Sequence, residues 1–343
     1  MQQAGRAECA GLNREKNKMM QRRTALGLAL AAGLAPNVAR AQGAWRPTRP
    51  VRLVVPFAPG GSNDIVGRII AEAAGNILGQ PVVVENRAGA GGNIGAMAAA
   101  QAEPDGYTLF LGTMATQGVN PILYPDPRFD PRKAFVGVGM MADMPNVLTC
   151  LPRRYNPANA REAIARAKAE PGKVLFGTVG NGSSAHLSLV MLEKLAGIEV
   201  VHVPYRGSAP AVAALLAGDL DLLFDASATS APHILQGSIK ALAVTMNKRI
   251  GSLPNTPTLE EEGVTGYHLS VWNGVFTQSR VPAPILARLQ DAFTKAMDEA
   301  MLNRLRGHHT EPLIIPSAEL QPWLDRDAER WGKVARESGI KID

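Results

Sequence analysis

Two short segments combine glycine and serine at the point where a β-rich run gives way to a helical one. The first covers residues 57–64 (FAPGGSND) and the second covers residues 180–186 (GNGSSAH). The start of a helix leaves four backbone N–H groups without partners inside the helix, and the helix dipole adds a partial positive charge. Glycine lets a ligand approach the backbone closely, and serine hydroxyls supply further donors. The chemistry indicated is the binding of an anion such as a carboxylate.

A serine at a helix start can also do nothing more than cap its own helix, so either segment alone is weak evidence. Their pairing in the two halves of the chain favours a binding site. A third turn of the same form covers residues 204–210 and contains Tyr205 and Arg206. Arg206 could pair with a carboxylate, although a solvated loop arginine is the commoner arrangement.

The residue types typical of catalysis form no convincing set. None of the six histidines belongs to a zinc-binding pattern, and the sequence contains neither a nucleophile elbow nor a P-loop. Ser183 and His186 would suit a secreted hydrolase, but a spacing of three residues at a helix start is a poor geometry for a base to reach its nucleophile. Gly89–Gly95 would suit an NADP-dependent reductase, yet its spacing favours a tight turn with close helix packing. We therefore expect no enzyme, no cofactor and no metal.

Strands alternating with helices must position these turns. Strands are expected at residues 51–55, 81–85, 107–112, 146–150, 174–178, 200–203, 220–224, 241–245 and 272–277, the last returning the chain to its first half. Helices are expected at residues 65–78, 93–102, 158–169, 184–196, 209–217, 285–306 and 318–338. This alternation indicates mostly parallel sheets covered by helices on both faces.

The length of 343 residues allows about two domains, and 46% hydrophobic with 19% charged residues indicates a globular chain. Most of the formal net charge of +6 lies in residues 1–41, so the remaining chain has no broad basic excess. That balance argues against nucleic acid as a partner. Cys9 and Cys150 are too few for a disulfide scaffold or a cysteine-based zinc cluster, and Cys150 is interpreted as a small buried residue.

Residues 1–41 have the layout of an export signal. An arginine pair at 22–23 precedes the apolar run 25–35, which is too short to span a bilayer, and an A-x-A cleavage pattern ends at Ala41. We expect cleavage near Ala41 and a mature protein in the bacterial periplasm. The arginine pair leaves the general secretory and the twin-arginine routes open, and the true start could lie near residues 19–20.

Longer motifs carry a family resemblance. In the first half they are RPVRLVVPFAPGGSND at residues 49–64, VENRAGAGGNIG at 84–95 and PDGYTL at 104–109. In the second half they are GNGSS at residues 180–184, HVPYRGSAP at 202–210 and LPNTPT at 253–258. With these motifs the chain resembles the Bug family, the TctC-like extracytoplasmic solute receptors of tripartite tricarboxylate transporters, from about residue 46 onward.

The resemblance implies a type II-like, two-lobed periplasmic binding protein fold. Each lobe would be an α/β unit whose mostly parallel mixed sheet is flanked by helices, with a ligand cleft between the lobes. Lobe one would comprise residues 42–145 and 268–343, and lobe two residues 146–267. The lobes would close about a hinge near residues 145–147 and 266–268.

The resemblance also implies that backbone groups and ordered waters at the two turns hold a ligand carboxylate. The implied binding residues are Phe57, Ala58, Gly60, Gly61, Ser62 and Asp64 in lobe one, Asn181, Gly182, Ser183, Ser184 and His186 in lobe two, and Thr113, Ser208 and Asp225 along the remaining wall. Gln117 stands where the family has a familiar histidine, and Ala226 where it usually has asparagine. These two departures leave the recognition of the ligand's distal end open.

The implied function is capture of a small organic carboxylate by a monomeric receptor that delivers it to TctA/TctB-like permease subunits. A ligand sensor that presents its closed form to the histidine kinase of a two-component system would share the same fold. Dicarboxylates, tricarboxylates, aromatic acids and nicotinate-like acids all suit one anchored carboxylate, so the sequence does not identify the ligand.

Overall fold

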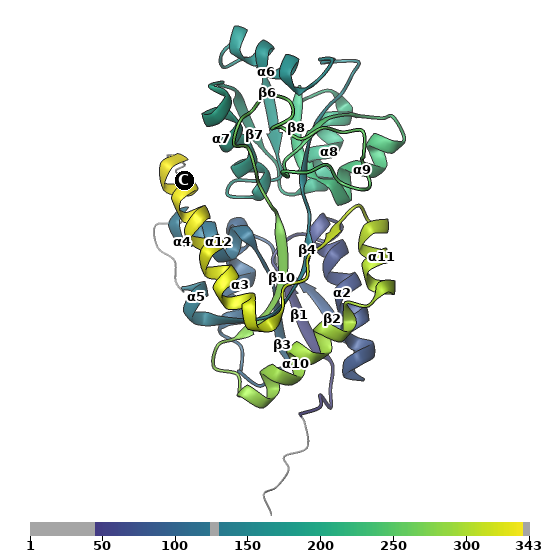
Figure 1. Cartoon of the computed structure of the whole chain (residues 1–343), viewed down its shortest axis with the longest axis vertical. Helices are drawn as coiled ribbons and strands as arrows, with labels where there is room; N and C mark the ends of the chain where they lie inside the picture. The colour runs from purple at the N-terminus through teal and green to yellow at the C-terminus, as the bar shows by residue number, and fades with distance from the viewer. Residues whose placement is uncertain (1–44, 124–129, 339–343) are drawn as a thin grey trace, which may run out of the picture. The chain divides into compact units, whose positions relative to one another are not determined.

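Alternating strands and helices build two separate mixed sheets, as the sequence pattern predicts (Figure 1). The structure is a computed structural model that describes residues 45–123 and 130–338. The expected export signal at residues 1–41 lies outside these residues. None of the helices in the described ranges is long and apolar enough to cross a bilayer.

The first sheet has the strand order β11-β4-β10-β3-β1-β2. Its strands are β1 (Val51–Val55), β2 (Val82–Asn86), β3 (Thr108–Thr113), β4 (Phe135–Asp143), β10 (Trp272–Gln278) and β11 (Glu311–Pro312). β1 pairs in parallel with β2 and β3, whereas β10 is antiparallel to β3 and β4. The return strand expected at residues 272–277 is therefore confirmed as β10.

Helices cover both faces of this sheet, so its strands are apolar on both sides. The helices and helical turns are α2 (Ser62–Leu78), η1 (Ala90–Gly92), α3 (Asn93–Ala100), η2 (Ala115–Val119), α4 (Asn120–Leu123), α5 (Pro131–Ala134), α10 (Ala283–Ala296), α11 (Glu299–Gly307) and α12 (Ser317–Ser338). Leu53 and Leu109 pack in one core cluster with α2 and α10. Val54 and Phe110 pack in another with α3 and α12. The alternation of side chains along a strand divides the two clusters.

The second sheet has the order β7-β6-β8-β5-β9. Its strands are β5 (Asn146–Cys150), β6 (Leu175–Thr178), β7 (Val201–Pro204), β8 (Leu222–Ala226) and β9 (Lys240–Val244), with helices α6 (Ala160–Ala169), α7 (Ser184–Ala196), α8 (Ser208–Ala217) and α9 (Ser227–Leu235). β6 is parallel to β7 and β8, and β5 is antiparallel to β8 and β9. Cys150 is fully buried on β5, and burial raises the pKa of its thiol to about 11, as expected for a structural residue.

Some element predictions were wrong. The single helix expected at 285–306 is divided into α10 and α11, because the Asp298 side chain accepts a hydrogen bond from Met301 N at 2.8 Å and starts a new helix. The strand expected at 220–224 runs from Leu222 to Ala226 instead. β4 and α9 were not predicted. Gly137 interrupts the apolar pattern of β4, and a Cβ there would stand 2.6 Å from Leu320 of α12, so the glycine allows close helix packing.

Two crossing segments connect the sheets, residues 144–145 between β4 and β5 and residues 245–271 between β9 and β10, and they pair where they join the first sheet. Met144 N donates to Val271 O at 2.9 Å. The buried carboxylate of Asp143 accepts from Val271 N at 2.9 Å and from the Ser270 hydroxyl. One acidic side chain therefore joins the two places where the chain passes between sheets.

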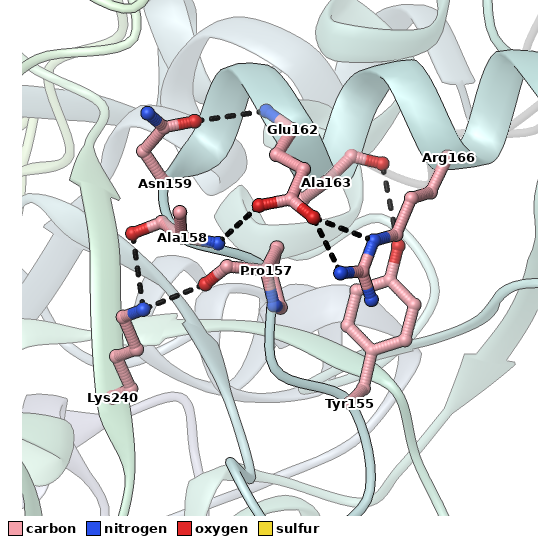
Figure 2. Close-up of polar contacts among 8 residues, drawn as sticks. All are labelled: Tyr155, Pro157, Ala158, Asn159, Glu162, Ala163, Arg166 and Lys240. Atoms are coloured by element: carbon pink, nitrogen blue, oxygen red, sulfur yellow. Dashed lines mark hydrogen bonds and ion pairs between the residues drawn. The ribbon is translucent and has the colours of Figure 1, made fainter.

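Figure 2 shows how the first turn of α6 is closed. Asn159 Oδ1 accepts a hydrogen bond from Glu162 N at 2.9 Å, and the Glu162 carboxylate accepts from Ala158 N at 2.5 Å. Asn159 thus caps α6 by satisfying one of its free N–H groups, and Glu162 binds the backbone of the residue before the cap. Lys240 of β9 donates to the Ala158 carbonyl at 3.0 Å, which ties the cap to the edge of the second sheet.

Replacing Asn159 with alanine should lower the free energy of unfolding by about 1 kcal/mol, because Glu162 N loses its acceptor. Urea unfolding followed by circular dichroism measures the difference. Asn159→Asp keeps the acceptor at the same position and should unfold at the wild-type midpoint. Equal midpoints for the alanine and aspartate variants would show that the cap contributes nothing.

Candidate functional site

A cleft of about 790 Å³ is lined by residues of both sheets. Four turns line it, namely the β1–α2 turn, the turn at residues 88–92, the β6–α7 turn and the β7–α8 turn. Each turn follows the carboxyl end of a parallel strand, which is where open α/β sheets bind ligands. Residues 57–64 and 180–186, for which the sequence predicts anion binding, therefore both contribute to the wall of the same cleft.

Helices α2, α7 and α8 begin at the wall of this cleft. They contain 17, 13 and 10 residues, so each is long enough to develop a helix dipole. Each helix start stabilises a nearby anion by roughly 0.3–1 kcal/mol, and by up to about 2 kcal/mol when partly buried. The helix starts at the cleft wall come from both sheets.

Arg206 is the single charged side chain among the described residues that line the cleft. Aspartate and glutamate are absent from this lining. A cationic group would find no counter-charge on the wall, whereas an anion meets an arginine and several helix starts. The electrostatics of the cleft therefore favour an acid.

Most of the residues implied by the family resemblance lie on the wall. They are Phe57, Ala58, Gly61, Ser62, Thr113, Asn181, Ser183, Ser184 and Ser208. The others are not among the lining residues, and each bonds to one of the turns or to a neighbouring residue: Gly60, Asp64, Gly182, His186 and Asp225.

Asp64 holds the first turn in shape. Its carboxylate accepts from Gly60 N at 3.0 Å, from Arg68 Nε at 3.0 Å and from Asn86 Nδ2 at 2.9 Å. Asn86 Nδ2 also donates to Phe57 O at 3.1 Å. Burial raises the pKa of Asp64, but the donors from Arg68, Gly60 and Asn86 outweigh it, so the pKa lies below the ordinary value. An ionised Asp64 therefore anchors both ends of the β1–α2 turn.

Ser183 and His186 hold the second turn. The Ser183 hydroxyl caps α7 by accepting from His186 N at 3.2 Å, and it donates to Gly180 O at 2.7 Å. His186 Nδ1 accepts from Gly182 N at 3.1 Å. The Ser183 hydroxyl and the His186 ring thus bond to the backbone and not to each other, so the pair lacks the nucleophile–base contact that a hydrolase needs.

Asp225 lies at the carboxyl end of β8, next to the start of α9. It is fully buried, and its carboxylate accepts hydrogen bonds from Ser230 at 2.8 Å and from Thr229. Burial raises its pKa above the ordinary value. Its bonds to Thr229 and Ser230 hold the first turn of α9, next to Ala226 of the cleft wall.

The glycine-rich stretch 89–95 forms the tight turn that its spacing favours. Gly92 has φ of +97°, and a Cβ there would stand 2.7 Å from Thr116 Cγ2. A Cβ on Gly95 would stand 2.8 Å from Arg87 O. These glycines allow close packing of α3 against the sheet, and residues 89–92 also line the cleft.

Several lining residues were missed by the sequence analysis. Asn63, Met144, Asn146 and Val271 belong to the wall. Met144 and Val271 are on the two crossing segments and meet only because these segments pair, so no local pattern could have revealed them. The two residues that depart from the family pattern lie in different places. Ala226 lines the cleft, whereas Gln117 is buried and is not among the lining residues.

Residues 66–340 match the family model described as "Tripartite tricarboxylate transporter family receptor". The chain belongs to this family. The receptor is 34% identical over 299 residues to Protein BugT of Bordetella pertussis. This alignment covers 86% of this chain and 91% of BugT. The expected relationship to the Bug family is therefore confirmed.

The receptor also has the expected periplasmic binding protein fold. It matches the periplasmic binding protein BugD with a TM-score of 0.80 and 32% identity, over 87% of this chain and 100% of BugD. It also matches the solved structure of R. palustris Rpa4515 with adipate. The TM-score is 0.82 and the identity 33%, over 86% of this chain and 99% of that protein. The compared family members are periplasmic binding receptors rather than enzymes.

Proposed function

We propose that this receptor captures a small organic carboxylate in the cleft between its two sheets. The observation that carries the proposal is that three helix starts, from both sheets, meet at a cleft lined by no acidic side chain in the described chain. The related protein with adipate supports the same class of ligand.

The carboxylate is proposed to lie between the β1–α2 and β6–α7 turns. The N–H groups of Ser62 and Ser184 stand first in their helices and have no backbone acceptor in the described chain, so both are available to an anion. Each hydrogen bond to a charged group contributes about 1.5–3 kcal/mol. Backbone donors of this kind would retain an acid without a dedicated arginine on either turn.

Binding is proposed to close the two lobes, residues 42–145 with 268–343 and residues 146–267, about a hinge near residues 145–147 and 266–268. An acid that touches both turns at once favours the closed form, because only that form offers both sets of donors. The pairing of Met144 with Val271 supports a hinge at the crossing segments.

The receptor is proposed to work as a monomer in the periplasm after cleavage near Ala41 and to deliver the acid to TctA/TctB-like permease subunits. A histidine kinase is the alternative partner, since it would recognise the same closed form. Co-purification from membranes with a tagged receptor, with and without acid, would identify which of the two binds.

Thermal unfolding of ligand-free receptor with a panel of organic acids tests the proposed function. A bound acid at 100 times its Kd should stabilise the folded state by about 2.7 kcal/mol and raise the melting temperature. Amines and neutral sugars of similar size are the controls and should give no shift. Native mass spectrometry of the protein as purified would reveal a retained acid. A panel without any positive acid would contradict the proposal.

A further inference from the structure

A pair of histidines lies behind the β6–α7 turn, outside the cleft lining. His186 is on the first turn of α7, and His202 is on β7. Their rings are stacked, with centroids 4.3 Å apart and planes inclined by 13°. Neither residue is among those that line the cleft in the described chain.

The hydrogen bonds of the pair reach both turns of the second sheet. His186 Nδ1 accepts from Gly182 N at 3.1 Å, within the β6–α7 turn. His202 Nε2 lies 2.6 Å from Thr178 Oγ1. The Thr178 carbonyl accepts from Tyr205 N at 2.9 Å, at the start of the β7–α8 turn. The stacked rings therefore connect two of the turns that line the cleft.

The contact with Gly182 fixes the protonation state of His186. An imidazole nitrogen that accepts from an N–H carries no proton, so the ring is neutral with its proton on Nε2. Burial and the nearby His202 lower the pKa of His186 to about 4, and burial lowers that of His202. Both shifts agree with a pair that remains uncharged at neutral pH.

The elements packed around α7 bring few charges toward this pair. β5 and β6 contribute the neutral Asn146 and Thr178, while Asp225 of β8 is engaged by Thr229 and Ser230. On α12, Asp327 accepts from Trp272 and Arg330 donates to His268. The titratable group stacked on His186 is His202, and its proximity adds to the effect of burial in lowering the pKa of His186.

We propose that His186 is a positioning residue that holds the Gly180–Ser184 turn in its acid-binding shape through the acceptor Nδ1. The inference rests on the proposed carboxylate site and names a residue on which that site depends. If the ring is protonated, Nδ1 becomes a donor and faces the Gly182 N–H without an acceptor between them. The turn then loses the contact that orients Gly182, and affinity for the acid falls.

Two substitutions at His186 test the hydrogen-bond acceptor and the stacked ring separately. His186→Asn places an amide oxygen near the position of Nδ1 but removes the stacked ring. His186→Phe keeps a ring against His202 but removes the acceptor. With adipate as the probe at pH 7.5, we expect His186→Asn to bind within about threefold of wild type and His186→Phe to bind at least tenfold more weakly.

Nitrogen-15 NMR of the wild-type protein gives a readout that needs no ligand. His186 should show the Nε2–H tautomer at pH 7, and the Gly182 amide signal should move with the same midpoint as His186, near pH 4. In His186→Asn this movement of the Gly182 signal should vanish. If His186→Phe does not fold, the affinity of the asparagine variant and the NMR titration still test the positioning role of His186.

The possible outcomes are distinct. Failure of wild type to bind adipate or any other acid counts against the proposed function, while the NMR titration still tests the role of His186. Equal affinity of wild type and a folded His186→Phe overturns the positioning role. A Gly182 amide signal that does not shift when His186 is protonated also overturns it.

Discussion

Ser184→Asp should abolish acid binding while leaving the fold intact. Ser184 stands at the first position of α7 on the cleft wall. An aspartate in the first turn of a helix is favourable for folding, so the free protein should melt at the wild-type temperature. The same fixed carboxylate would repel a bound carboxylate by about 4 kcal/mol at a separation of ~4 Å and an effective dielectric constant of ~20. After screening by salt, we expect at least a roughly 100-fold increase in Kd, which corresponds to about 2.7 kcal/mol.

The matched control is Ser184→Asn, which has nearly the same size and shape as the aspartate without its charge. Isothermal titration with the acid identified by the thermal panel should find the asparagine variant within a few fold of wild type. Raising the salt concentration should recover part of the affinity of the aspartate variant only. If the two variants bind equally, the acid group does not lie at the start of α7.

Asp143→Asn should make the protein more stable at pH 7.5, although it alters a buried hydrogen-bonded residue. Burial is the main cause that raises the pKa of Asp143 to about 6, and Asp327 adds to it. A carboxyl group whose pKa is higher in the folded state stabilises the fold fully below the unfolded pKa of about 3.8, and this contribution is lost as the pH rises through about 6. The pKa difference corresponds to a loss of about 3 kcal/mol by pH 7.5. Asparagine has no such loss.

Asparagine also fits the hydrogen bonds of the site. Its carbonyl can accept from Val271 N, and its amide can donate to the Ser270 hydroxyl, which can act as acceptor as well as donor. Urea unfolding of wild type and variant at pH 4.5, 5.5, 6.5 and 7.5 should show a difference that is about 1 kcal/mol at pH 4.5 and grows toward about 3 kcal/mol at pH 7.5.

The control is Asp291→Asn on the surface of α10, where the carboxylate pairs with Lys295. This pair is exposed, so the variant should change the stability by less than about 1 kcal/mol, without the rising difference. A pH-independent loss of stability in Asp143→Asn would contradict this prediction. It would mean that the hydrogen bonds of the ionised carboxylate stabilise the crossing segments by more than its burial destabilises them.

The binding turns could be recognised from local sequence because their chemistry is local. Glycine and serine at a strand–helix junction define free N–H donors whatever the rest of the chain does, so residues 57–64 and 180–186 were identified before the fold was known. The division of the chain between two sheets was visible in the return strand at 272–277. The break at Asp298 was missed, because apolar periodicity continues through a capping residue and hides the end of α10.

The sequence alone determined the class of fold and the family, and it predicted anion chemistry for two turns, because these follow from strand–helix alternation and from motifs contiguous in the chain. Only the tertiary structure decided which side chains face the cleft and which stand behind it. Asp64, His186 and Asp225 carry the polar groups that a sequence reader assigns to the ligand, yet each is turned to the backbone or to hydroxyls of its own lobe. Met144 and Val271 reach the same wall because two distant segments of the chain pair, and that information is in no single segment.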